Sequence, residues 1–138
     1  MKISLIGYKG SSVSIFPELA KELSKKISGL ELEERFAPEL EDIPELALES
    51  TKESDFVVVF ALTGEKDIAN AIKEKLIDVE LKSKVRILKE VEEDSFSASD
   101  EEDYLEEKDK LVEDLTQKIV DILFNENAFE PEDRDFGL

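Results

Sequence analysis

Apolar residues along the chain alternate between short continuous runs and longer stretches with helical spacing. The short runs predict four strands, at 2–7, 30–36, 56–62 and 85–91. Between and after them, apolar residues recur every three or four positions and predict four helices, at about 16–27, 42–54, 68–79 and 105–123. The order βαβαβαβα predicts a three-layer α/β fold, in which right-handed crossovers build a four-stranded parallel sheet flanked by helices.

The strands differ in how their apolar residues are arranged. The run 56–62 is apolar on both faces and β-branched at its centre, which is typical of a central strand covered on both sides. In the run 30–36, apolar and charged residues alternate, which predicts a strand that lies near the edge of the sheet or has one face exposed. We expect a single domain over residues 1–138, with an acidic connector at 92–103 and a tail at 125–138.

Composition excludes several classes of chemistry. The chain has no cysteine and no histidine, so thiol nucleophiles, thiolate metal sites and the usual neutral-pH general base are absent, and we expect no metal site. The acidic run 92–103 lacks the ligand spacing of a calcium loop and is better explained as a solvated connector. A net charge of −18 disfavours binding to nucleic acid or to an anionic membrane surface. With no apolar run long enough to span a bilayer and no secretory signal, a cytoplasmic protein is expected.

Ligands of parallel sheets bind beyond the carboxyl ends of the strands, which nominates the loops at 8–14, 37–42 and 63–67. The first loop contains Gly10 between Gly7 and several serines, a composition that can cradle phosphate through backbone N–H groups. It has neither of the glycine spacings of known phosphate loops, so an ordinary turn with Ser12 or Ser14 capping the next helix is the favoured interpretation.

Several short motifs are distributed along the whole chain. The clearest is 37–44 (APELEDIP), which is followed by 55–62 (DFVVVFAL). Tyr104-Leu105, Leu123-Phe124 and the stretch 133–137 (DRDFG) come later in the chain. In these motifs and their spacing the chain resembles the lumazine synthase superfamily, and most closely its archaeal riboflavin synthase branch. The resemblance covers essentially the whole chain and implies a lumazine synthase-like, flavodoxin-like sheet in a homo-oligomer, usually a pentamer, whose sites lie between subunits.

The resemblance also implies an activity, the dismutation of 6,7-dimethyl-8-ribityllumazine to riboflavin, which needs no added cofactor. Lys66 and Asn70 are the expected catalytic residues, Lys66 polarising a ring carbonyl and Asn70 standing where the family carries a histidine. The expected substrate-binding residues share the three loops and are Ser11, Ser12, Asp42, Thr63 and Gly64. Positioning alone can lower the barrier by several kcal/mol, so a site without histidine remains compatible with this reaction.

Two other interpretations remain open. The family's histidine–acid pair is replaced by Asn70-Ala71 and its first loop is poor in aromatic residues, which favours an inactive paralogue that binds a lumazine- or flavin-like ring or is purely structural. A flavodoxin-like electron carrier is a weaker alternative, because the loop lacks the expected threonines and flanking aromatics. We further expect the tail to pack on a neighbouring subunit through Phe129 or Phe136.

Overall fold

The computed structural model describes residues 1–94 and 100–124 and contains alternating strands and helices. The elements are β1 (Lys2–Tyr8), α1 (Phe16–Lys26), β2 (Glu31–Ala37), the short 3₁₀ helix η1 (Leu40–Asp42), α2 (Ile43–Thr51), β3 (Phe56–Thr63), α3 (Lys66–Ser83), β4 (Arg86–Glu93) and α4 (Glu101–Phe124). The four strands are parallel and have the order β2-β1-β3-β4. The predicted fold class, a three-layer α/β fold with a four-stranded parallel sheet, is confirmed.

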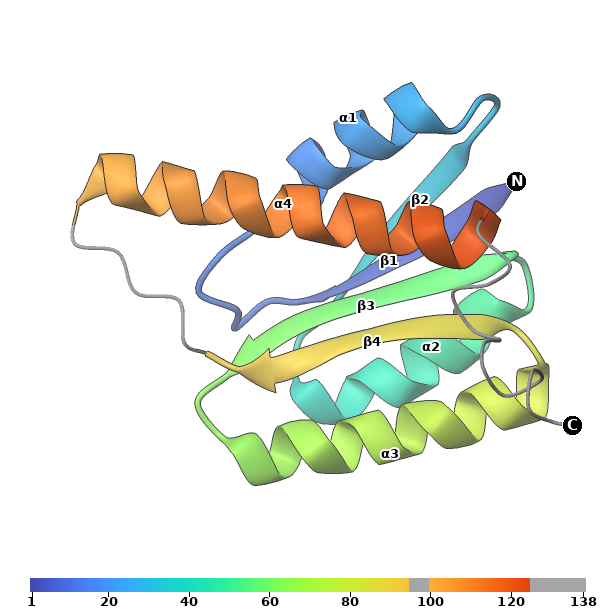
Figure 1. Cartoon of the computed structure of the whole chain (residues 1–138). Helices are drawn as coiled ribbons and strands as arrows, with labels where there is room; N and C mark the ends of the chain where they lie inside the picture. The colour runs from blue at the N-terminus through green and yellow to red at the C-terminus, as the bar shows by residue number, and fades with distance from the viewer. Residues whose placement is uncertain (95–99, 125–138) are drawn as a thin grey trace, which may run out of the picture.

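Helices cover both faces of the sheet (Figure 1). On one face, α1 and α4 pack over a core that includes Leu5, Leu19 and Leu115. On the other, α2 and α3 pack over a core that includes Val57 and Leu76. Strand β3 contributes to both cores, because its alternate residues point to opposite faces. The central position predicted for this strand, and the edge position predicted for β2, are therefore confirmed.

Several boundaries differ from those expected. The acidic stretch predicted as a connector contains the last two residues of β4 and the first turn of α4. Carboxylates suit that first turn because the amino end of a helix carries partial positive charge. Leu105, the first apolar residue of the last predicted helix, is 49% exposed. The cause is visible in Figure 1, where the first turns of α4 extend past the tips of the strands and have no sheet beneath them.

The tail at 125–138, with Phe129 and Phe136, lies outside the described residues, so its expected packing stays a prediction. Among the helices in the described part of the chain, none is both long enough and apolar enough to cross a membrane.

Candidate functional site

The connections after β1 and β3 leave the sheet in opposite directions, which creates a candidate site between them. The chain runs from β1 to α1 on one face and from β3 to α3 on the other, although β1 and β3 are neighbours. In open α/β sheets, ligands bind at such a switch point, beyond the carboxyl ends of the strands. Here Ser11 bridges the two sides, since its Oγ accepts a hydrogen bond from the Leu62 backbone N–H at 3.0 Å.

A gap in the side-chain layer lies beside this bridge, at the last buried residue of β1. Gly7 is in register with Phe36 of β2 on one side and with Phe60 of β3 on the other. Residues in register on parallel strands point to the same face, so two phenylalanines flank a position that has no side chain. Phe16, from the start of α1, approaches the same position, and its ring centroid lies 5.6 Å from that of Phe36.

The result is an open pocket of about 200 Å³, which we call the Gly7 pocket. It is lined by Gly7, Tyr8, Lys9, Ser11, Val13, Ser14, Ile15, Phe16, Phe36 and Phe60. Most of this lining is aromatic, aliphatic or glycine, and Lys9 is its one charged residue. Phe36 is 43% exposed, whereas Phe16 and Phe60 are buried. The pocket therefore offers fixed aromatic surface at its base and a more accessible ring at its rim.

Both glycines of the first loop region lie against aromatic side chains. A Cβ added at Gly7 would lie 2.8 Å from the Phe36 ring and 3.0 Å from the Phe16 ring. At Gly10 an added Cβ would overlap the end of the Tyr8 ring, which would have to move aside. The close approach of an aromatic ring therefore gives each glycine a role in packing.

The structure brings only part of the expected site together. Of the substrate-binding residues, Ser11 lines the Gly7 pocket, while exposed Ser12 does not. The residue preceding α1 is Ile15, and no side chain caps that helix, so the expected serine cap is wrong. Asp42 instead borders a separate shallow hollow of about 290 Å³ with Phe36, and its Oδ2 accepts a hydrogen bond from the Glu39 backbone N–H at 3.2 Å.

The remaining expected residues lie between the last residue of β3 and the first two turns of α3. Thr63 is buried, and its Oγ1 accepts a hydrogen bond from the Glu65 backbone N–H at 3.2 Å, which makes it a turn residue. Gly64, Lys66 and Asn70 are exposed and do not line the pocket. Within residues 1–94 and 100–124, the Lys66 ammonium makes no ion pair.

The sequence interpretation missed Phe36 and Phe60 as site residues. Phe36 was assigned to an alternating edge strand and Phe60 to an apolar run, and neither lies in a loop. The available signal was the glycine next to the end of β1, together with a phenylalanine near the end of each neighbouring strand. It could be used only once the strand order and register were known, because they place these residues side by side.

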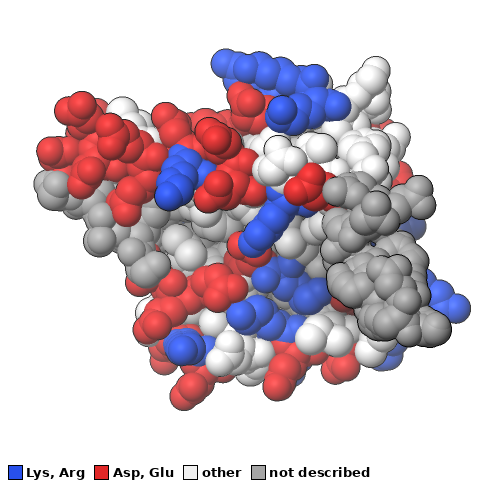
Figure 2. All heavy atoms as spheres, in the orientation of Figure 1, with Lys and Arg blue, Asp and Glu red and all other residues white. Residues whose placement is uncertain are grey.

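Acidic side chains dominate the surroundings of the strand tips. Figure 2 shows them gathered over the amino-terminal half of α4, which extends beyond the sheet. One of the carboxylates on the neighbouring helix is paired: Glu18 of α1 lies 2.9 Å from Lys108 of α4, and this contact holds the pKa of Glu18 below its ordinary value. No group of three or more acidic side chains in the described part of the chain is placed to hold a metal ion.

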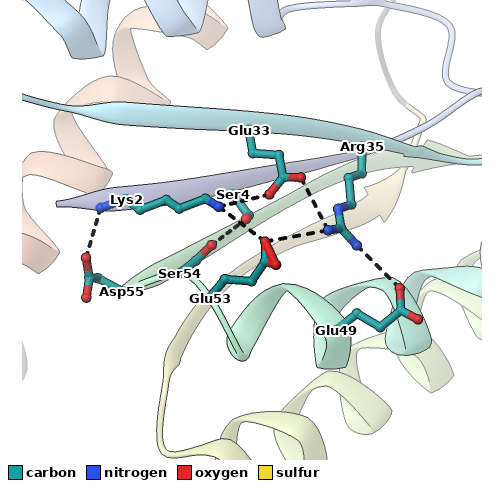
Figure 3. Close-up of polar contacts among 8 residues, drawn as sticks. All are labelled: Lys2, Ser4, Glu33, Arg35, Glu49, Glu53, Ser54 and Asp55. Atoms are coloured by element: carbon teal, nitrogen blue, oxygen red, sulfur yellow. Dashed lines mark hydrogen bonds and ion pairs between the residues drawn. The ribbon is translucent and has the colours of Figure 1, made fainter.

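A second polar cluster lies on the α2 side of the sheet and has a structural role (Figure 3). Its members are Lys2, Ser4, Glu33, Arg35, Glu49, Glu53, Ser54 and Asp55. Lys2 contacts Glu33 at 3.3 Å and Glu53 at 3.2 Å, and so joins β1 to the edge strand and to the segment after α2. Beneath these ion pairs, the buried hydroxyls of Ser4 and Ser54 are hydrogen-bonded at 2.6 Å.

This cluster contains two of the groups whose pKa is shifted. Glu53 and Glu33 raise the pKa of the Lys2 ammonium above its ordinary 10.5. Lys2, with help from Arg35, holds the pKa of the Glu33 carboxyl below its ordinary 4.5. Both shifts favour the charged forms, as expected for ion-pair partners rather than for a catalytic acid or base.

No protein-family model matches the chain, and no curated protein matches it significantly.

Proposed function

We propose that this protein is a divergent relative of the lumazine synthases that binds a flat, lumazine- or flavin-like heterocycle in the Gly7 pocket. The observation that carries the proposal is the gap at Gly7, flanked in register by Phe36 and Phe60 and bordered by Phe16. Planar ring systems pack well on aromatic surfaces, and the quadrupoles of the rings favour stacked or edge-to-face contacts. The sequence resemblance supports the same ligand class independently.

The size of the pocket supports a site that is completed by another subunit. Ligand pockets commonly have volumes of roughly 300–1,000 Å³, whereas the Gly7 pocket has about 200 Å³ and is open to the surface. Part of a ribityl-bearing heterocycle would then extend beyond the strand tips, where the accessible ring of Phe36 lies. A homo-oligomer, as in the pentamers of the superfamily, would cover that part of the ligand.

Binding is better supported than turnover. The two expected catalytic residues, Lys66 and Asn70, are exposed on α3 and lie outside the pocket of their own chain. The same exposure leaves them available to a ligand held by an adjacent copy, so riboflavin synthase activity at subunit interfaces is the second candidate function. The two candidates differ in whether riboflavin is formed from the lumazine.

Titration of the purified protein with riboflavin and with 6,7-dimethyl-8-ribityllumazine, followed by ligand fluorescence, tests the binding proposal. We expect saturable binding that Phe36→Ala weakens about tenfold, because stacking of a flat ring on an aromatic side chain is worth about 1–3 kcal/mol. Leu81→Ala is the matched control, since Leu81 is an exposed apolar residue on α3, remote from the pocket. Absence of binding, or an equal effect of both variants, would contradict the proposal.

The same preparation distinguishes binding from catalysis. Prolonged incubation with the lumazine alone produces riboflavin if the second candidate is correct, and Lys66→Ala should then lower the rate without changing the affinity for riboflavin. Sedimentation of the complex tests whether a neighbouring copy covers the site. Tight binding with no riboflavin formed identifies the protein as a binding paralogue.

A further inference from the structure

The outer edge of β4, on the side away from β3, is a surface to which a further strand can pair. Two side chains block part of this edge. Within the described residues, β4 has one strand neighbour, β3. An edge strand with unpaired N–H and C=O groups is a template for pairing with another chain. Such an edge must be protected if the protein is not to associate through it.

Two side chains occupy this edge at Ile87. The Ile87 backbone N–H donates a hydrogen bond to Glu80 Oε2 at 2.7 Å. Its carbonyl oxygen accepts a hydrogen bond from Lys89 Nζ at 2.9 Å. The same ammonium donates to Glu80 Oε1 at 2.8 Å, so one ion pair holds both backbone groups. The Glu80 and Lys89 side chains are 23% and 21% exposed, which makes this pair less accessible to water than most ion pairs among residues 1–94 and 100–124.

We call the Glu80–Lys89 ion pair, with its two hydrogen bonds to Ile87, the Glu80–Lys89 clamp. We propose that this clamp keeps β4 from pairing with β4 of a second copy of this chain. The outward backbone groups of β4 belong to Ile87 and to the residues two and four positions after it, because successive residues of a strand face opposite sides. The clamp therefore blocks the first of these positions, and a second strand cannot pair there unless Glu80 and Lys89 move away.

The sequence of β4 favours β4 of a second copy as its pairing partner. An antiparallel pairing with Leu88 opposite Leu88 makes Ile87 and Lys89 a hydrogen-bonded pair, which matches the outward groups. The same register places Arg86 opposite Glu90, so charges of opposite sign lie across from each other. Glu90 would then contact Arg86 of the second copy in addition to Lys118 of its own chain, which lies 2.9 Å away. Shifting the centre to Lys89 or to Glu90 would place like charges directly opposite each other.

Apolar surface next to the edge adds to the tendency to associate. Helix α3 contacts β4 through Lys73, which lies 3.2 Å from Glu92, and through Glu80. Ile77 lies one turn from both of these residues and is 44% exposed, and Leu81, one turn further, is 71% exposed. Sheet extension across β4 would bring this flank of α3 against the second copy.

Sedimentation velocity of the full chain, compared with the variants at equal concentration, tests the clamp. We expect Glu80→Ala to form a species of twice the wild-type mass, with self-association at least tenfold tighter than that of the wild type. Lys73→Ala is the matched control, because it removes an ion pair between the same helix and strand that does not touch the backbone. Glu80→Gln retains an acceptor for the Ile87 N–H and should behave as the wild type does.

Circular dichroism checks that each variant is folded. If Glu80→Ala does not fold, Lys89→Ala provides the test, because it frees the Ile87 carbonyl and should also increase association. The proposal is overturned if the folded clamp variants keep the wild-type mass, if Lys73→Ala associates equally, or if Glu80→Gln associates as strongly as Glu80→Ala. Wild-type riboflavin binding does not enter these outcomes, so failure here leaves the proposed function untouched.

Discussion

At the scale of single residues, the candidate site depends on Gly7, which has no side chain. Gly7 carries no Cβ, and this absence lets the rings of Phe36 and Phe16 lie over the end of β1. The phenylalanines on either side provide aromatic surface for the pocket, and the missing side chain of Gly7 provides its volume. A residue that usually signals a turn is here part of a strand that defines a pocket.

Gly7→Ala tests this role directly. The added methyl group meets Phe36 at 2.8 Å and buried Phe16 at 3.0 Å, and overpacking of this kind typically costs about 1–3 kcal/mol. We expect a lower free energy of unfolding in urea and a loss of heterocycle binding.

Gly64→Ala is the control, since a Cβ added there would have no heavy atom within 4 Å and the residue sits in the neighbouring loop of the same sheet edge. It should leave the free energy of unfolding nearly unchanged. Unchanged binding in Gly7→Ala would remove the main support for the pocket.

At the scale of elements, both edge strands carry charges that tie them to neighbouring helices. Glu33 and Arg35 connect β2 to β1 and α2, as Glu80 and Lys89 connect α3 and β4. Alternating charges are typical of edge strands because they discourage pairing with other chains. The alternating sequence predicted a charged edge strand at β2, whereas the contacts of Glu80 and Lys89 with β4 are seen only in the structure.

The cluster around β2 predicts a pH dependence. The pKa of Glu33 in the folded state lies below its ordinary 4.5. The ionised carboxylate therefore stabilises the folded state at pH values above 4.5. This stabilisation is lost as the pH falls through the lowered pKa. We expect Glu33→Gln to reduce the loss of melting temperature between pH 5 and pH 3. Glu34→Gln, the adjacent exposed carboxylate of β2, should follow the wild-type curve. Identical curves for all three proteins would contradict this role.

At the scale of the whole molecule, repulsion among carboxylates opposes folding. The chain has 36 acidic and 18 basic residues, so at most half of the carboxylates can be paired one to one. A large net charge destabilises the compact state through self-repulsion. Salt weakens both this repulsion and the exposed ion pairs, but the excess of 18 negative charges makes repulsion the larger effect.

We therefore expect the melting temperature to rise when sodium chloride is increased from about 20 mM to about 500 mM, because the Debye length falls from tens of ångströms to a few. Differential scanning calorimetry measures this shift. Sucrose at matched osmolality controls for general solute effects. A lower melting temperature at high salt would show that the ion pairs, and not the net charge, dominate the electrostatic energy.

The sequence by itself determined the number and order of the strands and α-helices, but not the short 3₁₀ helix η1. Local periodicity reports which face of an element is buried, and right-handed crossovers then leave a parallel sheet as the outcome. It also distinguished the central strand β3 from the charged edge strand β2, because burial on one or both faces leaves a distinct pattern. The tertiary structure decided which residues meet: Gly7 lies between Phe36 and Phe60, Ser11 bonds to Leu62, and Lys66 and Asn70 lie outside the pocket. These pairings join residues that are distant in the chain. They depend on strand order and register, and the periodicity of the sequence encodes neither.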